Sequence, residues 1–545
     1  MGDNENAASL YFLIYLGLLT VLLLLSNELH RHPRIKSVLS EASLAILIGM
    51  LASSVVAAFF LVQGRQSYDD DDNVAGTANG RSIFYSLVSF EPQVFFLAQL
   101  PPILFNAGYQ LRRELFYRHM PAISLFGRLG TAMSALTTAF ILYGVKAAGL
   151  MGNFDPTLTE LLTFGSLIAG TDTVSILGVF QDKKVEPRLF YVVFGESTLN
   201  KAVSIVLFKT FSNFMVSDLN VDMGDTLWLT LDLIIEFWWL AIASPFFGFV
   251  SAVGAALIFK YADMRQNHML ELSLYVLLMY CPYVISENLN MSGVVTIFFA
   301  GIFSRRYVEP NVSEETKRNA DAIFKLTAFL SEIGIFLELG LSVFGHTGSF
   351  RWAFIGWSFL AALIGRACSI YPLSFYYNRT LTERIPPNGG SDDTLVGMDD
   401  DDSSCSSDAS SVSSSNGRSH PSSRGKKIPP RKRRKKRKTP EQRRDMKISI
   451  DMMHVLWFAG LRGAVAYALA KSFPDTFGHR DEFICCTMVI VLVMIIVMGG
   501  GTEMFLNHLD ITMNVDEEKY MKEWYKKQEL RGGNIFQFGK GGGSV

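Results

Sequence analysis

Cysteine and histidine are scarce in this sequence, and neither type is spaced as a set of ligands. Its 545 residues include 5 cysteines and 9 histidines, with no metal-site or disulfide spacing among them. No phosphate-binding loop, nucleophile motif, pore filter or voltage sensor is present. An enzyme and a channel are therefore disfavoured, and we expect no cofactor and no fixed metal site. We interpret the cysteines as packing residues: Cys281, Cys368, Cys405, Cys485 and Cys486.

An excess of charge is also missing, because the formal net charge is −1. A near-neutral chain has no overall attraction to nucleic acid, so any electrostatic role must be local. Hydrophobic residues make up 49% of the chain and aromatic residues 12%, and the mean hydropathy is positive. This composition is too apolar for an ordinary soluble protein and indicates that the lipid bilayer is the solvent.

Long apolar runs predict an all-α polytopic membrane protein. A membrane helix needs roughly 20 apolar residues, and counting such runs gives about 13 candidate spans. The seventh run contains Pro245, which marks either a kink or the boundary between two helices. The runs lie near residues 9–26, 41–63, 82–108, 121–150, 161–180, 190–215, 226–258, 268–285, 289–304, 323–345, 352–377, 448–472 and 482–506.

The short loops predict the orientation of these spans, because lysine and arginine accumulate on the cytoplasmic side. Alternate loops are acidic, as in SYDDDDN and SDLNVDMGD. With 13 spans the N-terminus then lies outside or in a lumen, and the C-terminus lies in the cytosol. The basic loops that fall on one face are HRHPRIK, RRELFYRH, DKKVEPR, KYADMRQNH and SRRYVEPNVSEETKR.

One segment interrupts the membrane pattern and sets the domain boundaries. Residues 378–447 join a Ser/Asp-rich stretch to a basic run at 426–438, so we expect a disordered cytosolic loop. The basic run is interpreted as a site for anionic lipid or a tether to the acidic half, with a nuclear signal or nucleic-acid patch as the alternative. The expected domains are residues 1–377 (spans 1–11), the loop 378–447, residues 448–506 (spans 12–13) and a cytosolic tail, 507–545.

The fifth run, FGSLIAGTDTVSILGVF, carries polar residues in its middle. Glycines and the cluster Thr171-Asp172-Thr173 interrupt it, which favours unwinding at mid-membrane, where freed carbonyl groups and helix ends hold a cation or its carboxylate partner. The alternative is that Asp172 caps a short helix at an interface.

The sixth run, FGESTLNKAVSIVLFK, has a polar stripe. Glu196, Asn200 and Ser204 share one helical face by their spacing of four, and Ser197 and Lys201 lie beside it. A charge at the bilayer centre costs roughly 3 kcal/mol, so such residues are kept for pairing or for function. The stripe is either part of an ion pathway or a structural ion-pair network.

Two late spans carry arginines, Arg366 and Arg462. Arginine does not readily lose its proton, so each requires an acid partner or a solvated cavity. The candidate acids are Glu196, Asp172, Glu287, Glu332 and Glu338. A set of buried acids and arginines spread over several spans is typical of an ion pathway.

Five segments in this order resemble the eukaryotic sodium/proton exchanger family of monovalent cation/proton antiporters. They are LPPILFNAG (100–108), AGTDTVSILGVF (169–180), FGESTLNKAVSIVLF (194–208), MSGVVTIFFAGIFSRRYVEPNVS (291–313) and FAGLRGAVAYALA (458–470). The resemblance extends over roughly residues 10–510. VMGGGTEMF (497–505) is similar to the endosomal and vacuolar branch, which implies an intracellular membrane.

The resemblance implies an inverted-repeat fold of 13 spans with two crossing broken helices, a homodimer, and elevator-type exchange of sodium or potassium for protons. Thr171 and Asp172 match the Thr-Asp pair at the helix crossing, and Arg462 matches the Gly-Leu-Arg-Gly arginine. Glu196 matches the Gly-Glu-Ser glutamate, which in the family pairs with the arginine that is Arg366 here. Asn200 matches the asparagine of the Asn-Asp pair.

Lys201 departs from this pattern, because the family has the ion-binding aspartate at that position. Three hypotheses follow. In the first, the chain is a working exchanger whose site is rebuilt around Asp172, Glu196 and Asn200, with Lys201 as the proton carrier. In the second, it is a transport-silent homologue that acts as a regulator or scaffold. In the third, Lys201 is an introduced substitution in an ordinary exchanger.

Overall fold

The chain was analysed as a computed structural model. It describes residues 2–32, 39–66, 92–111, 113–217, 226–289, 291–343, 350–383, 447–509, 511–517, 519, 520 and 522. The acidic and basic stretches of the 378–447 segment, including the proposed lipid site at 426–438, lie outside these residues. Residues 1–376 and 448–545 form one compact unit, and residues 377–447 form a second.

Every regular element in the described part of the chain is helical. The elements up to the first unwound region are α1 (Gly2–Arg31), α3 (Glu41–Gln66), α5 (Pro92–Val94), η1 (Phe95–Gln99), α6 (Leu100–Gln110), α7 (Arg113–Ser124), η2 (Leu125–Gly130), α8 (Thr131–Ala147) and α9 (Leu158–Ala169). The middle of the chain holds α10 (Val174–Asp182), α11 (Pro187–Ser217), α12 (Thr226–Tyr261), α13 (His268–Asn288), α14 (Gly293–Tyr307), η4 (Glu309–Asn311) and α15 (Glu314–Ser342). The last elements are α16 (Trp352–Glu383), α18 (Ile450–Phe458), α19 (Ala464–Lys471), α20 (Arg480–Val493), η6 (Met494–Gly499) and α21 (Thr502–His508).

Seven helices in the described residues are long and apolar enough to cross a membrane. They agree with the all-α polytopic fold that the sequence predicts, whereas the count of 13 spans stays a prediction. Two predicted spans are split into short helices, the fifth into α9 and α10 and the twelfth into α18 and α19. The seven are Leu13–Arg31, Glu41–Ala58, Leu115–Ala147, Ile242–Tyr261, His268–Asn288, Trp352–Leu381 and Arg480–Gly499.

The seventh run forms one helix, α12, with Pro245 inside it. The alternative of two helices is therefore wrong. The helix packs closely against α14 beside the proline: the Ser244 hydroxyl accepts from the Ser292 N–H at 3.1 Å, and the Ser244 carbonyl accepts from the Thr296 hydroxyl at 3.3 Å. Membrane helices tolerate proline where neighbouring helices and local adjustments compensate for the lost hydrogen bond.

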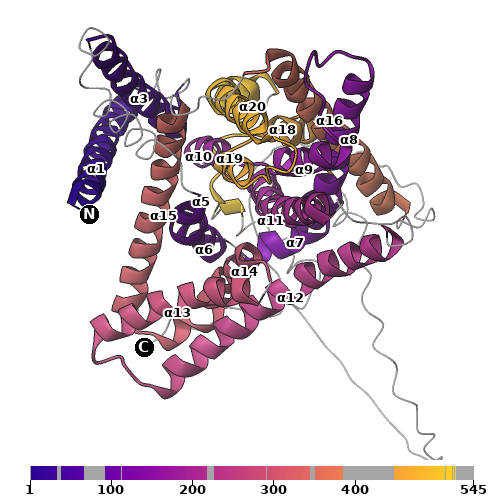
Figure 1. Cartoon of the computed structure of the whole chain (residues 1–545). Coiled ribbons are helices and arrows are strands. Elements are labelled where there is room, and N and C mark those ends of the chain that lie inside the picture. Colours follow the sequence, from indigo (N-terminus) through magenta and orange to yellow (C-terminus); the bar gives the residue numbers. More distant parts are fainter. Residues whose placement is uncertain are drawn as a thin grey trace, which may run out of the picture. The chain divides into compact units, whose positions relative to one another are not determined.

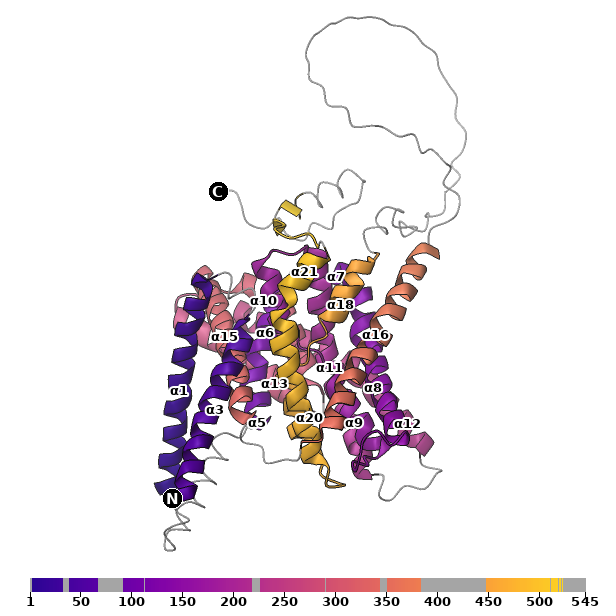
Figure 2. The same ribbon diagram turned by 90° about the horizontal axis from the view of Figure 1, so that it is seen from above.

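The described helices pack in two sets that meet around α11 and α19. In one set, α9 packs against α8, α11 and α19; in the other, α14 packs against α6, α12 and α13, and α15 packs against α3 and α6. Figure 1 shows the short helices α9, α10, α18 and α19 gathered together. Figure 2 shows α20 continuing through η6 into α21. Among the described cysteines, Cys485 and Cys486 are buried as expected, whereas Cys281 and Cys368 are exposed.

The segment after α21 folds back onto the connection between α10 and α11. The Asn514 and Val515 N–H groups donate to the carbonyls of Lys183 and Lys184, both at 2.9 Å, and the Glu186 N–H donates to the Thr512 carbonyl at 3.1 Å. The end of the helical unit is thus fastened to the loop that joins two site-bearing helices.

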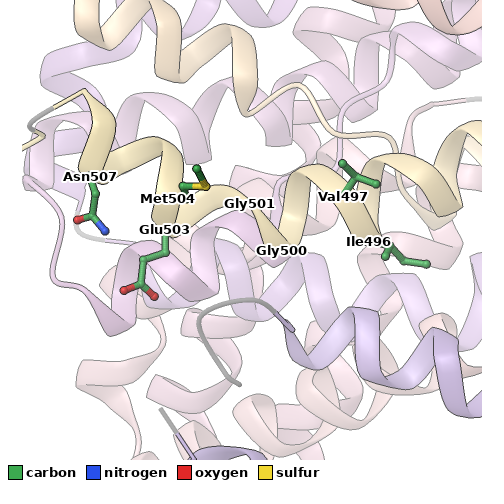
Figure 3. A pocket seen from close by; sticks show the side chains of 7 residues that line it. All are labelled: Ile496, Val497, Gly500, Gly501, Glu503, Met504 and Asn507. Carbon is green, nitrogen blue, oxygen red and sulfur yellow. The ribbon is translucent and has the colours of Figure 1, made fainter. Parts of the chain in front are cut away.

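A shallow groove of about 540 Å³ runs along η6 and α21. Figure 3 shows its lining residues along this one helical stretch. None of them is a predicted site residue, and the one ionisable group among them, Glu503, pairs with Lys183 at 2.6 Å. The groove therefore belongs to the surface of the last helix. It is lined by Ile496, Val497, Gly500, Gly501, Glu503, Met504 and Asn507.

Candidate ion-exchange site

Two unwound stretches lie in the middle of the helical unit. The first separates α9 from α10: Gly170 ends α9 with an extended ψ of 117°, and α10 starts after Thr173. The second separates α18 from α19, and Gly463 precedes α19 in an extended conformation. Glycine, threonine and aspartate favour such interruptions because they support turns and helix ends better than helix interiors.

The two stretches contact each other directly. The Asp172 N–H donates to the Leu461 carbonyl at 2.8 Å, and the Arg462 Nη1 donates to the Ala169 carbonyl at 3.1 Å. A Cβ atom on Gly463 would overlap the Asp172 carboxyl group, so only glycine allows this approach. These contacts join the fifth and twelfth predicted spans where both are unwound.

Charges at this crossing complement the helix ends. Asp172 lies one residue before Thr173, the N-cap residue of α10, and its carboxyl group lies against Gly463 at the start of α19, a helix N-terminus. Arg462, which is 1% exposed, donates to the last residue of α9, a C-terminus. Helix N-termini favour anions and C-termini favour cations. Asp172 thus lies at the crossing with its side chain 10% exposed, and it also precedes the short helix α10.

The polar stripe of α11 faces the unwound stretch of the fifth span. The Asn200 amide donates to the Thr171 hydroxyl at 2.9 Å and to Glu196 Oε1 at 3.1 Å. The Ser197 hydroxyl donates to the Thr171 carbonyl at 3.3 Å. The predicted face of α11 is therefore the face that meets the crossing.

Glu196 and Arg366 form a buried two-pronged ion pair. Arg366 Nη1 and Nη2 contact the two Glu196 carboxylate oxygens at 2.7 and 2.9 Å. Nη2 also donates to the Leu456 carbonyl at 2.9 Å. A Cβ atom on Gly460 would press on the arginine side chain, so glycine makes room for it. This pair connects α11, α16 and α18 beside the crossing.

Lys201 pairs with Asp172. Its Nζ lies 2.8 Å from Asp172 Oδ1, and each side chain is 10% exposed. The ammonium therefore occupies the one carboxylate that stands between the helix ends. Glu196, the other acid of the polar stripe, is occupied by Arg366, so Asp172 is the partner of Lys201.

The three supporting acids have different surroundings. Glu332 on α15 lies within electrostatic range of Asp172 and Lys201. Glu287 accepts from the Gly293 N–H at 2.9 Å at the start of α14 and pairs with Lys209 at 3.3 Å. Glu338 accepts from the Gln99 amide at 2.6 Å. Of these three, the structure brings Glu332 toward the crossing.

Two buried oxygen atoms are candidate ligands; sequence reasoning named Asn200 as a site residue but missed Thr173. Asn200 Oδ1 and Thr173 Oγ1 are buried, and neither has a hydrogen-bond donor in the described residues. Buried oxygen atoms without donors are acceptors available to a cation. The Thr171-Asp172-Thr173 cluster was a signal for Thr173, whose hydroxyl lies in the unwound stretch.

Comparison with known proteins identifies the family of this chain. The transmembrane sodium/hydrogen exchanger family matches residues 9–386. The chain belongs to this family. Sodium/hydrogen exchanger 9 of Rattus norvegicus is 31% identical over 447 residues, which cover 81% of this chain and 59% of that protein. Human sodium/hydrogen exchanger 8 is 30% identical over 424 residues, which cover 77% of this chain and 61% of that protein. This exchanger-family chain thus spans about three-fifths of the length of these relatives.

A solved structure has the same fold. The sodium proton antiporter MjNhaP1 from Methanocaldococcus jannaschii matches with a TM-score of 0.53 at 14% identity, covering 92% of this chain and 98% of that chain. At this identity the likeness concerns the fold alone. The chain is therefore an integral membrane protein of the exchanger family with the all-α fold of an antiporter.

Proposed function

We propose that this chain exchanges a monovalent cation, sodium or potassium, for protons by alternating access of the elevator type. The observation that carries the proposal is Asp172 at the crossing of two unwound spans, beside the donor-free oxygens Asn200 Oδ1 and Thr173 Oγ1. A carboxylate and neutral oxygens held between broken helices are suited to a small cation that must bind and leave. Membership of the exchanger family supports the same activity.

Lys201 sets the condition for exchange. A cation cannot share the Asp172 carboxylate with an ammonium 2.8 Å away, because like charges so close in a poorly solvated site repel strongly. The ammonium must therefore leave Asp172 when the cation arrives. Two routes meet this condition: Lys201 loses its proton, or it moves with its proton to a second carboxylate. In the first route cation and proton compete directly, whereas in the second the cation competes with the ammonium for Asp172 and the second carboxylate binds the proton.

The same ion pair favours a second candidate function. If Lys201 never leaves Asp172, the site stays closed and the chain is a transport-silent homologue that acts as a regulator or scaffold. The ion pair in the structure is the observation that supports this alternative. A substitution introduced at position 201 would give the same closed site.

The remaining proposals concern surroundings and partners. We propose a homodimer in an intracellular membrane, on the resemblance of residues 497–505 to the endosomal and vacuolar branch. We also propose a cytosolic C-terminus, which the distribution of basic loops supports. The run at 426–438 is proposed to bind anionic lipid.

Reconstituted vesicles test the proposed function. The wild-type chain, Lys201→Asp and Asp172→Asn are placed in liposomes with an internal pH dye, and sodium or potassium is added outside. We expect a cation-dependent pH change in the wild type and none in Asp172→Asn, which lacks the carboxylate. If Lys201→Asp exchanges and the wild type does not, the chain is a silenced exchanger. If neither the wild type nor Lys201→Asp exchanges, the proposal is overturned.

A further inference from the structure

One ionisable side chain near the crossing has no role in the site as described so far. Glu332 lies within α15, where the residues that follow it, from Ile333 to Leu337, are buried. Its own side chain is half-buried, and in the described residues it has no hydrogen bond and no ion pair. A partly buried carboxylate that has no hydrogen-bond donor and no cation in contact with it is costly as an anion in a membrane helix. Glu332 is therefore the member of the site that is free to bind a proton.

Glu332, on α15, belongs to a different element from both members of the Asp172–Lys201 pair. Both members of the pair lie within its electrostatic range. α15 packs against α19, and the residue before α19, Gly463, lies against the Asp172 carboxyl group. Lys201 thus has two carboxyl groups near it: Asp172, which it contacts, and Glu332, which it does not.

We propose that Glu332 is the proton-binding group of the exchange and that, once ionised, it takes the Lys201 ammonium from Asp172. This inference rests on the proposed function and assigns its proton carrier. It follows the second of the two routes, in which Lys201 stays charged throughout. Lys201 then acts as a movable internal cation that links the proton site to the cation site.

The charges balance in both loaded states. With the proton bound, Glu332 is neutral, and Lys201 and Asp172 neutralise each other, as in the structure. With the cation bound, Asp172 holds the cation and Lys201 neutralises ionised Glu332. Each state sums to zero over the three side chains and the bound ion. One cation therefore exchanges for one proton, and proton uptake by Glu332 sends Lys201 back to Asp172 and expels the cation.

Other ionisable groups near Glu332 are engaged elsewhere. Glu41 on α3 lies within its electrostatic range but pairs with His30 at 3.2 Å. Tyr15 of α1 lies against α15 at Gly334. Glu338, further along α15, is held by Gln99. Glu338 and Glu332 both lie in the second half of α15. In the described residues Glu338 has a hydrogen-bond donor and Glu332 has none, so Glu338 serves as a matched control.

Three variants test the proposal in the full chain: Glu332→Gln, Lys201→Arg and the control Glu338→Gln. Glutamine keeps the shape but binds no proton, so we expect Glu332→Gln to lose exchange by more than about tenfold, whereas Glu338→Gln stays near wild type. Arginine keeps its proton, so exchange in Lys201→Arg excludes lysine as the carrier. Exchange by Glu332→Gln within about twofold of wild type overturns the proposal.

Infrared difference spectra test the proposal without a transport assay. Sodium is added to the purified chain at constant pH, and the C=O stretch of protonated carboxyl groups is followed. We expect the band to decrease in the wild type and in Glu338→Gln, and no change in Glu332→Gln. An unchanged band in the wild type, or a decrease that persists in Glu332→Gln, contradicts the assignment. If the wild-type band decreases but no exchange occurs, the proposed function fails and the proton site stands.

Discussion

The Glu196–Arg366 pair shows how much one side chain can matter in this site. Arg366 is 3% exposed and Glu196 0% exposed, and two hydrogen bonds of 2.7 and 2.9 Å join them. Removing one partner leaves the other as a buried charge without compensation. We expect Arg366→Ala to destabilise the chain by about 3–5 kcal/mol, measured as a lower melting temperature in detergent.

An exposed ion pair provides the control for that measurement. Lys325 and Asp321 lie 2.7 Å apart on α15, with side chains 55% and 38% exposed. Solvent screens such a pair, so Lys325→Ala should cost less than about 1 kcal/mol. Equal melting temperatures for Arg366→Ala and wild type would show that the buried pair contributes no stability.

At the scale of elements, the close contact between the two unwound stretches depends on glycine. An alanine at Gly463 would place its Cβ within the Asp172 carboxyl group, so Gly463→Ala must separate α19 from the start of α10. We expect a loss of about 1–3 kcal/mol in stability, as for other overpacked sites, together with loss of exchange. The backbone is extended there, so lack of space is the cause.

A second glycine gives the opposite expectation. Gly178 lies within α10 and has open space where a Cβ would be added. Alanine is the better helix former by about 1 kcal/mol, so Gly178→Ala should raise the melting temperature. If Gly463→Ala leaves the melting temperature unchanged or raises it, as Gly178→Ala should, the contact between Gly463 and Asp172 does not limit stability.

The sequence predicted features that depend on one segment and missed those that depend on two. The fifth span unwinds at Gly170 and Thr173 as expected, because the signal lies in its own residues. The approach of Glu332, and not of Glu287, to the crossing was not predictable, because spacing gives a residue's face on its own helix but not the helix it meets. The proline in α12 was ambiguous because a proline alone does not show whether a helix ends or continues through it.

At the scale of the whole chain, the segment after α21 connects the end of the helical unit to its middle. Besides the backbone hydrogen bonds to residues 183–186, the Tyr191 hydroxyl donates to Glu517 at 3.1 Å, and Tyr520 packs against an apolar cluster that includes Phe298 and Phe299. The loop at 183–186 joins α10, which starts beside Asp172, to α11, which carries Lys201. The segment therefore restrains the loop that joins these two helices, α10 and α11.

Two truncations measure this restraint. Each backbone hydrogen bond contributes about 1 kcal/mol, so deleting residues 511–545 removes roughly 3 kcal/mol of local stability from the loop. We expect faster amide hydrogen exchange in peptides covering residues 182–190. Deleting residues 523–545 leaves every described contact of the segment in place and serves as the control. If exchange rates at residues 182–190 are the same in both truncations, the segment does not hold α10 and α11 together, and control of the crossing lies within the helices themselves.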